Sequence, residues 1–267
     1  MRNEGKKNVI GILVDAVDYE TAVEFILREA KEKRGATVSA LAVHGLMTGV
    51  MGAEQRFRLN HFDLLVPDGQ PVRWALNLLH GVKLHDRVYG PTLTLKVCER
   101  AATEGLAIFL YGGTHEILSA LTKSLKERFS AILIAGTETS RFRRLSPREK
   151  RELVSRIKSS GASIALVGLG CPRQEVFAYE FHKQISMPTL AVGAAFPFIA
   201  GLLPQAPSWM QDRGLEWFFR LCFEPGRLWR RYLYLNPAYL CLLALQASGI
   251  KRFSTKGMCP THEELYG

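Results

Sequence analysis

The chain has 267 residues, of which 47% are hydrophobic and 22% are charged, so a folded core is expected and a largely disordered chain is excluded. The formal net charge of +10 predicts a polyanionic partner: the phosphates of a nucleotide, a nucleic acid or an anionic membrane surface. Five scattered cysteines without a CxxC pair argue against zinc and disulfides, and no apolar run of signal-peptide length precedes Asp15, so a reducing, cytosolic setting is expected.

From its start, the chain alternates short apolar runs with helical patterns. The run at 8–14 predicts a first strand, and Asp18 is placed to cap a helix that continues to about residue 33. Further apolar runs predict strands at 38–43, 62–66, 106–111, 131–135, 163–167 and 189–192. Helical spacing predicts helices at 45–58, 69–79, 92–103, 114–128 and 172–185.

Another predicted helix begins at Ser146, between the last strands of the series. Pro147 suits its first position, and Glu149 completes a capping box with Ser146. Continuous apolar strands that alternate with helices indicate a mostly parallel sheet that is buried on both faces. The predicted fold is therefore α/β, with a Rossmann-like sheet flanked by helices.

The composition changes toward the C-terminus, where the strand signal disappears and aromatic and arginine residues become frequent. We therefore predict two units, a Rossmann-like core at 1–204 and a helical C-terminal appendage at 205–267. Residues 232–250 carry no charge, but only 13 of them follow Asn236-Pro237, and a spanning helix needs about 20 apolar residues. We interpret this stretch as a helix that lies on the membrane or packs on the core.

Two residues that follow predicted strands are candidates for the chemistry, because ligands of open parallel sheets bind beyond the carboxyl ends of the strands. Asp68 stands between Pro67 and Gly69 and could accept a proton from a hydroxyl nucleophile. An aspartate in this position is also common as a helix cap or turn residue. His44 follows the second strand. It either contacts a substrate or is a buried histidine whose ring nitrogens form hydrogen bonds within the protein.

Two glycine turns join strands to helices, one at Gly112-Gly113 and one at Gly168 and Gly170. Glycines there allow backbone N–H groups to approach a phosphate at a helix N-terminus, although tight turns need glycine for their own sake. Neither turn is a G-x-G-x-x-G fingerprint with an acidic residue downstream, and there is no Walker A loop. A dehydrogenase or a P-loop enzyme is therefore disfavoured.

The segment after the second turn carries further polar candidates. Gln174 and Glu175 could read a uracil edge or a ribose diol, or they could simply open a capped surface helix. Cys171 has no assignable histidine partner, which argues against a thiol nucleophile.

The chain contains no D-x-D triplet, the usual metal-binding signature of metal-dependent glycosyltransferases, so we predict neither a metal nor another cofactor. If the chain is a glycosyltransferase, cationic side chains and helix N-termini must therefore offset the charge of the leaving diphosphate in place of a metal. Arginines of the appendage suit this role and equally suit an anionic surface. They are Arg213, Arg220, Arg227, Arg230 and Arg231.

A series of motifs runs through nearly the whole chain, from about residue 8 to 235, and it resembles the WecG/TagA/CpsF family of bacterial glycosyltransferases. The segments of the type G-x-P-[KR]-Q-E and R-x-G-L-E-W are its most specific members. The motifs are V-P-D-G at 66–69, D-R-V-Y-G-P at 86–91, L-Y-G-G at 110–113, G-L-G-C-P-R-Q-E at 168–175, G-A-A-F at 193–196, A-P at 206–207, R-G-L-E-W at 213–217 and E-P at 224–225.

The resemblance implies an inverting, metal-independent transferase that moves a sugar from a UDP-sugar to an undecaprenyl-diphosphate-linked acceptor at the inner face of the cell membrane. It implies that Asp68 is the general base, that Arg87 lies in a loop of the cleft, and that Gln174 and Glu175 belong to the nucleotide-binding segment. It also implies that the arginines of the appendage help to close the site and meet the membrane.

The chain departs from the family pattern at the cleft, with A-V-H at 42–44 in place of T-P-N, A-F-P at 195–197 in place of S-F-D, and P-Q at 204–205 in place of a basic pair. The donor sugar can therefore be N-acetylmannosamine, a hexose or a uronic acid, and we expect an exopolysaccharide-type member.

Other classes of protein remain as alternatives. They are a nucleic-acid-binding protein, a nucleotide-sugar-binding protein without transferase activity, and a nucleotide-sugar dehydrogenase or epimerase. The first lacks any recognisable nucleic-acid-binding motif, so we expect no nucleic-acid partner. The residues leave open whether copies of the chain associate.

Overall fold

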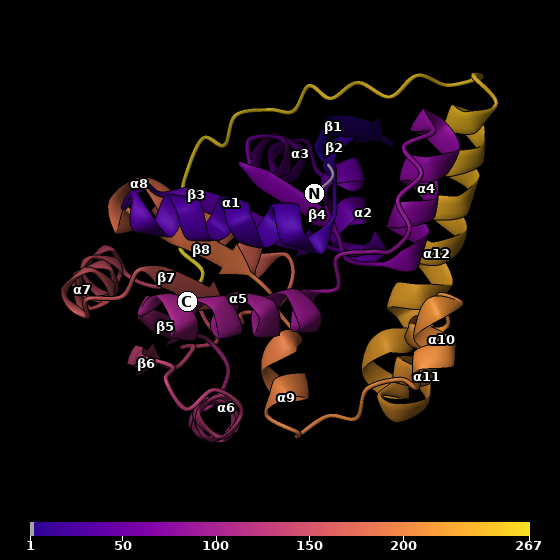
Figure 1. The fold of residues 1–267 in the computed structure, drawn as a ribbon. Helices are drawn as coiled ribbons and strands as arrows, with labels where there is room; N and C mark the ends of the chain where they lie inside the picture. The colour runs from indigo at the N-terminus through magenta and orange to yellow at the C-terminus, as the bar shows by residue number, and fades with distance from the viewer. Residues whose placement is uncertain (1–2) are drawn as a thin grey trace.

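The computed structural model describes residues 3–267 and is built around a six-stranded parallel sheet with the strand order β4-β3-β8-β7-β5-β6 (Figure 1). Every neighbouring pair in this sheet is parallel, which confirms the predicted α/β fold. The strands are β3 (Ala36–Leu41), β4 (Leu64–Pro67), β5 (Ile108–Tyr111), β6 (Ile134–Glu138), β7 (Ile164–Val167) and β8 (Pro188–Ala191).

Helices cover both faces of the sheet, as the continuous apolar strands predict. Along β5, Ile108 and Leu110 belong to the core under α1, α5 and α6, whereas Phe109 and Tyr111 belong to the core under α7 and α8. The helices of the core are α1 (Tyr19–Lys31), α2 (Val43–Met51), α3 (Ala53–Asn60), α4 (Gln70–His80), α5 (Gly90–Glu104), α6 (His115–Arg128), α7 (Pro147–Ser159), α8 (Arg173–Ile185) and α9 (Ala195–Ile199).

The predicted first strand at 8–14 is wrong. The chain forms a separate antiparallel hairpin there, of β1 (Asn3–Val9) and β2 (Ile12–Val17). Ile10 and Gly11 make the reversal, with φ angles of 52° and 87°, as a two-residue hairpin turn requires. Ile10 is buried, so its apolar side chain extended the strand pattern across the turn and hid the reversal.

Other boundaries also differ from the sequence predictions. The predicted helix at 45–58 is two helices, because Gly52 adopts an extended conformation between α2 and α3. The predicted strand at 131–135 begins three residues later, as β6. The capping box is confirmed: the Ser146 hydroxyl accepts a hydrogen bond from the Glu149 N–H, and the Glu149 carboxylate accepts one from the Ser146 N–H.

After the core, the chain forms α10 (Ser208–Asp212), α11 (Glu216–Phe223) and α12 (Pro225–Ala247). One side of α12 packs on the core, where the buried Tyr239 donates a hydrogen bond to the carbonyl of Pro71 over 2.8 Å. Gln246 accepts a hydrogen bond from the N–H of Ile10 over 2.7 Å. Across residues 3–267, no helix combines the length and apolar character needed to cross a membrane.

The last residues of the chain leave α12 and return across the core as an extended tail (Figure 1, yellow). Asn8 of the hairpin donates a hydrogen bond to the carbonyl of Phe253 over 2.8 Å. Asn60 at the end of α3 donates one to the carbonyl of Thr255, also over 2.8 Å. From Phe253 onward, the tail therefore packs on the core.

Candidate functional site

Asp68 directly follows β4 and is held by the backbone of two neighbouring segments. Its N–H donates to the carbonyl of Leu41 at the end of β3 over 3.3 Å, and its carboxylate accepts a hydrogen bond from the N–H of Gly90 over 2.5 Å. Burial raises the pKa of Asp68 from 3.8 to about 6, and the nearby Arg87 partly opposes this. A carboxylate with a pKa just below neutrality is suited to act as a general base.

Arg87 lies next to Asp68 and joins the core to the appendage. Its guanidinium donates to the Glu216 carboxylate over 2.8 Å and to the Gln211 side-chain oxygen over 2.9 Å. The Tyr89 hydroxyl donates to the other oxygen of Glu216 over 2.8 Å, and Arg87 stacks on the Tyr89 ring at 4.1 Å. Both charged side chains are largely buried, so this network fixes α10 and α11 to the core beside Asp68.

His44 lies in the first turn of α2, close to the C-terminal arginines. Burial, helped by the positive charges of Arg231 and Arg220, lowers its pKa from 6.5 to about 4. Its Nδ1 atom is buried and has no hydrogen-bond partner. At neutral pH, His44 is therefore an uncharged imidazole with an unused ring nitrogen.

The two predicted glycine turns lie against one another. A β-carbon on Gly112 would stand 2.7 Å from the carbonyl of Gly168, and φ at Gly112 is 117°, so only glycine fits there. Gly168 donates its N–H to the carbonyl of Tyr111 over 2.8 Å. By ordinary strand spacing, the Gly112-Gly113 turn, four strands from β4, lies roughly 19 Å from Asp68, and the turn at Gly168 and Gly170, three strands from β4, lies roughly 14 Å from it.

Further glycines connect Asp68 with these turns along the edge of the sheet. A β-carbon on Gly90 would lie 3.4 Å from the Asp68 carboxylate and 3.7 Å from the carbonyl of Val192. One on Gly193 would lie 3.0 Å from the Gln174 side-chain oxygen. Glycine at these positions therefore lets the segments that follow β4, β7 and β8 pack closely at the carboxyl edge of the sheet.

Gln174 and Glu175 are both buried beneath the second turn. The Gln174 side-chain oxygen accepts a hydrogen bond from the N–H of Gly170 over 3.1 Å, and its amide donates to Glu175 over 2.9 Å. Ser39 of β3 also donates to Glu175, and burial raises the pKa of this carboxyl. Both side chains therefore support the backbone of the turn from inside the protein.

Cys171 is not an activated thiol. Burial and the neighbouring Glu175 raise its pKa well above the ordinary value. This agrees with the prediction that it is not a nucleophile.

The predicted arginines of the appendage divide into two groups. Arg220 and Arg231 lie near the site, where Arg220 acts on the pKa of Asp68 and both act on His44. Arg213 and Arg230 are exposed and stack on Trp209 and Trp229, at 5.8 and 5.2 Å from the ring centres. Arg227 lies in the first turn of α12, but its side chain is outside the part of the chain that the structure describes.

The sequence prediction missed Glu216, Gln211 and Tyr89. Glu216 lies within the R-G-L-E-W motif and Tyr89 within the D-R-V-Y-G-P motif, so both residues belong to motifs that the sequence shows. Nothing in the local pattern shows that the two motifs meet, because they are separated by more than 100 residues.

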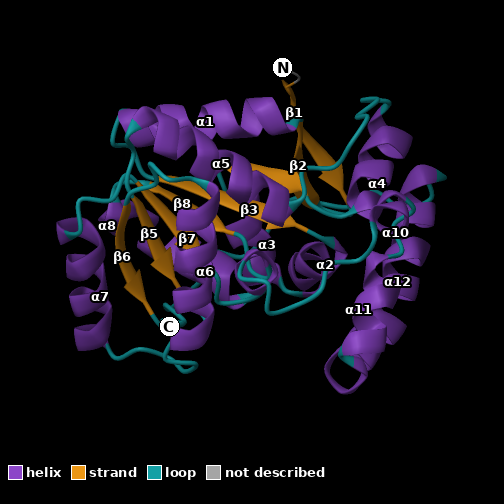
Figure 2. Cartoon of the chain, turned by 60° about the horizontal axis from the view of Figure 1, so that its bottom comes forward, coloured by secondary structure: helices purple, strands orange, loops and turns teal. Residues whose placement is uncertain are grey.

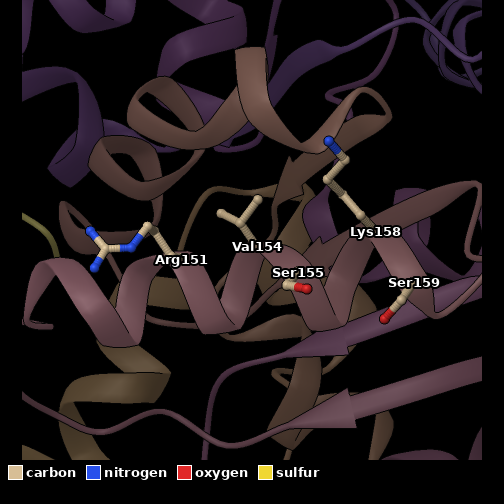
Figure 3. Close-up of a pocket in the computed structure, with 5 residues that line it drawn as sticks. All are labelled: Arg151, Val154, Ser155, Lys158 and Ser159. Atoms are coloured by element: carbon tan, nitrogen blue, oxygen red, sulfur yellow. The ribbon is translucent and has the colours of Figure 1, made fainter.

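The hollow drawn in Figure 3 is not part of this site. It has a volume of about 480 Å³ and is lined along one helix, α7, by Arg151, Val154, Ser155, Lys158 and Ser159. A hollow along a single helix encloses little of any ligand. Within residues 3–267, no group of three or more histidine, cysteine or acidic side chains is arranged to hold a metal ion.

Comparison with known families gives one match that bears on this geometry. The model of the family described as "Glycosyl transferase WecG/TagA/CpsF family" matches residues 7–252. The match contains the whole parallel sheet, Asp68, both glycine turns and the helices α10–α12.

Proposed function

Because the chain belongs to the WecG/TagA/CpsF family of glycosyl transferases, we propose that it moves a sugar from a UDP-sugar to a lipid-diphosphate-linked acceptor during synthesis of an exopolysaccharide or another cell-surface polymer. One observation carries the proposal beyond the family. Asp68 has a pKa of about 6 and lies beside a charged network that ties the appendage to the core.

In the proposed reaction, Asp68 takes the proton of the acceptor hydroxyl as its oxygen attacks C1 of the donor sugar. The new bond forms between the acceptor oxygen and C1, and the bond between C1 and the diphosphate breaks from the opposite face. UDP leaves and the configuration at C1 inverts. General base action is worth about 10²- to 10⁴-fold in rate.

The leaving diphosphate needs positive charge, and we assign this role to arginines. Arg220 and Arg231 contribute positive potential at the site, and Arg87 stands beside Asp68. We assign the nucleotide to the two glycine turns on the same edge, which lead into the N-termini of α6 and α8. This set supports a metal-independent reaction.

We propose that His44 helps to distinguish donor sugars. It is neutral and has an unused ring nitrogen, so it can form one hydrogen bond to a sugar hydroxyl, an acetamido group or a carboxylate. N-acetylmannosamine, a hexose and a uronic acid all remain within the proposal.

We further propose that the appendage holds the enzyme on the anionic inner face of the cell membrane. Exposed apolar and aromatic side chains gather on α4 and α10–α12, and two of the tryptophans carry a stacked arginine. Such a combination suits the interface between headgroups and acyl chains. These side chains are Trp74, Leu78, Trp209, Trp217, Phe218, Phe223, Trp229, Leu233, Tyr234 and Leu240.

A direct assay tests the proposed donor and reaction class. Purified protein is given a panel of UDP-sugars with a short-chain lipid-diphosphate-linked sugar, in the presence of EDTA, and UDP release is measured. We expect release that needs the acceptor with one class of donor. Tight UDP binding by calorimetry without release from any donor would indicate a nucleotide-sugar-binding protein instead.

A further inference from the structure

The tail at 253–267 lies beyond the family match, which ends at residue 252. It nevertheless runs across the core (Figure 1) and is hydrogen-bonded to it at several points. The N–H of Met258 donates to the carbonyl of Ala53 over 3.0 Å. Gly257 approaches α3 so closely that a β-carbon on it would stand 2.4 Å from the backbone nitrogen of Phe57.

The end of the tail is fixed by α8 and by the segment after β6. The Glu180 carboxylate accepts hydrogen bonds from the N–H groups of Glu264 and Leu265, over 2.8 and 3.0 Å. Leu145 donates its N–H to the carbonyl of Leu265 over 2.7 Å. Figure 2 shows that the C-terminus lies near the arrowheads of β5 and β6, at the carboxyl edge of the sheet.

Two hydrogen bonds connect the tail to the first glycine turn. The buried hydroxyl of Ser140 donates to the carbonyl of Gly267 over 2.9 Å. The N–H of Ser140 donates to the carbonyl of Gly113 over 3.1 Å. Ser140 therefore transmits the position of the tail to the Gly112-Gly113 turn.

An aromatic contact connects the tail to the second turn. The Tyr266 ring lies against two guanidinium groups, 5.9 Å from Arg144 and 5.7 Å from Arg173. Arg173 is the first residue of α8 and follows the turn that contains Gly170. The last residues of the tail thus touch neighbours of both turns.

We propose that residues 253–267 are a positioning element of the donor site, in which Tyr266 and Gly267 hold the two glycine turns ready for a nucleoside diphosphate. The idea rests on the proposed function, because that function places the nucleotide at these turns. A turn that is ordered before the ligand arrives lowers the entropic cost of binding. The tail would therefore act on donor affinity rather than on the chemical step.

The first test separates donor binding from turnover. Tyr266→Leu removes the ring and Ser140→Ala removes the link to the first turn, while Tyr266→Phe keeps the ring. Thr261→Ala is the control, since this exposed tail residue bonds only to His262. We expect the first two variants to raise KM for the UDP-sugar and Kd for UDP roughly three- to tenfold, with kcat and the acceptor KM unchanged. Tyr266→Phe and Thr261→Ala should match the wild type.

The second test does not depend on activity. Hydrogen exchange is compared for the full chain, Tyr266→Leu, Ser140→Ala and a chain that ends at residue 252. We expect faster exchange at the amides of Gly112, Gly113 and Gly170 in all three variants. Unchanged exchange there, or an equal loss of kcat and donor affinity, would overturn the positioning role. If the wild type binds no UDP, the proposed donor fails, whereas the exchange result still decides the role of the tail.

Discussion

The carboxyl group of Asp68 illustrates how burial and charge are balanced at a single residue. Burial raises its pKa, Arg87 lowers it and Glu216 raises it, with the outcome of about 6. At neutral pH the group is mainly ionised and can still accept a proton. Its pKa should therefore change when the charge of Arg87 or Glu216 is removed.

The dependence of activity on pH follows from this balance. We expect kcat/KM to rise with pH through about 6, because the base must be ionised and kcat/KM reports the free enzyme. In Glu216→Gln, the rise of kcat/KM should occur at lower pH, because a negative charge that raises the pKa of Asp68 is removed. Glu127→Gln, an exposed residue of α6, is the control. If kcat/KM rises at the same pH in Glu216→Gln as in the wild type, the assignment of Asp68 as the general base is contradicted.

The raised pKa of Asp68 also predicts that its ionised carboxylate lowers the free energy of unfolding. Its folded pKa of about 6 exceeds the ordinary 3.8, so its charge destabilises the fold above pH 6, and this cost is lost as pH falls toward 4. Asp68→Asn should be more stable than the wild type at pH 8, by up to about 3 kcal/mol, with no difference near pH 4. Urea unfolding at the two pH values measures this. Equal stability at pH 8 would show that the carboxylate is well solvated.

At the scale of elements, the strands and helices of the core were largely predictable because their apolar periods are regular. The strands β3, β4, β5, β7 and β8 overlap their predicted ranges, whereas the hairpin at Ile10-Gly11 and the break at Gly52 do not show in a periodic pattern. The candidate site was predictable only in part. Asp68 and Arg87 could be named from motifs, but the Arg87–Glu216 ion pair joins segments whose contact only the three-dimensional packing sets.

We predict that exposed arginines on the helices of the appendage strengthen binding to anionic membranes. Arg213 and Arg230 are exposed on the aromatic face, and each cation near an anionic surface is worth about 1 kcal/mol. Replacing both with Gln should weaken binding to vesicles rich in anionic lipid about 30-fold and leave binding to neutral vesicles unchanged. Lys123→Gln with Lys126→Gln on α6 removes the same charge elsewhere and serves as the control. Equal losses in the two double variants would mean that net charge alone drives binding.

At the scale of the whole molecule, three segments far apart in the sequence converge on one edge of the sheet. The core supplies Asp68 and the glycine turns, the appendage supplies Glu216, Arg220 and Arg231, and the tail reaches the neighbours of both turns. The order of the strands spreads these groups along the edge from β4 to β5. Under the proposed function, an extended donor would lie along this edge with its sugar at Asp68 and its base at the turns.

The central claim is that Asp68 is the general base of a metal-independent glycosyl transfer. Acceptor-dependent UDP release is measured with EDTA for the wild type, Asp68→Asn and Asp212→Asn, an exposed control, with UDP affinity determined in parallel. We predict that Asp68→Asn loses about 10²- to 10⁴-fold in kcat while its Kd for UDP changes little, and that Asp212→Asn behaves as the wild type. Full turnover by Asp68→Asn would contradict the claim.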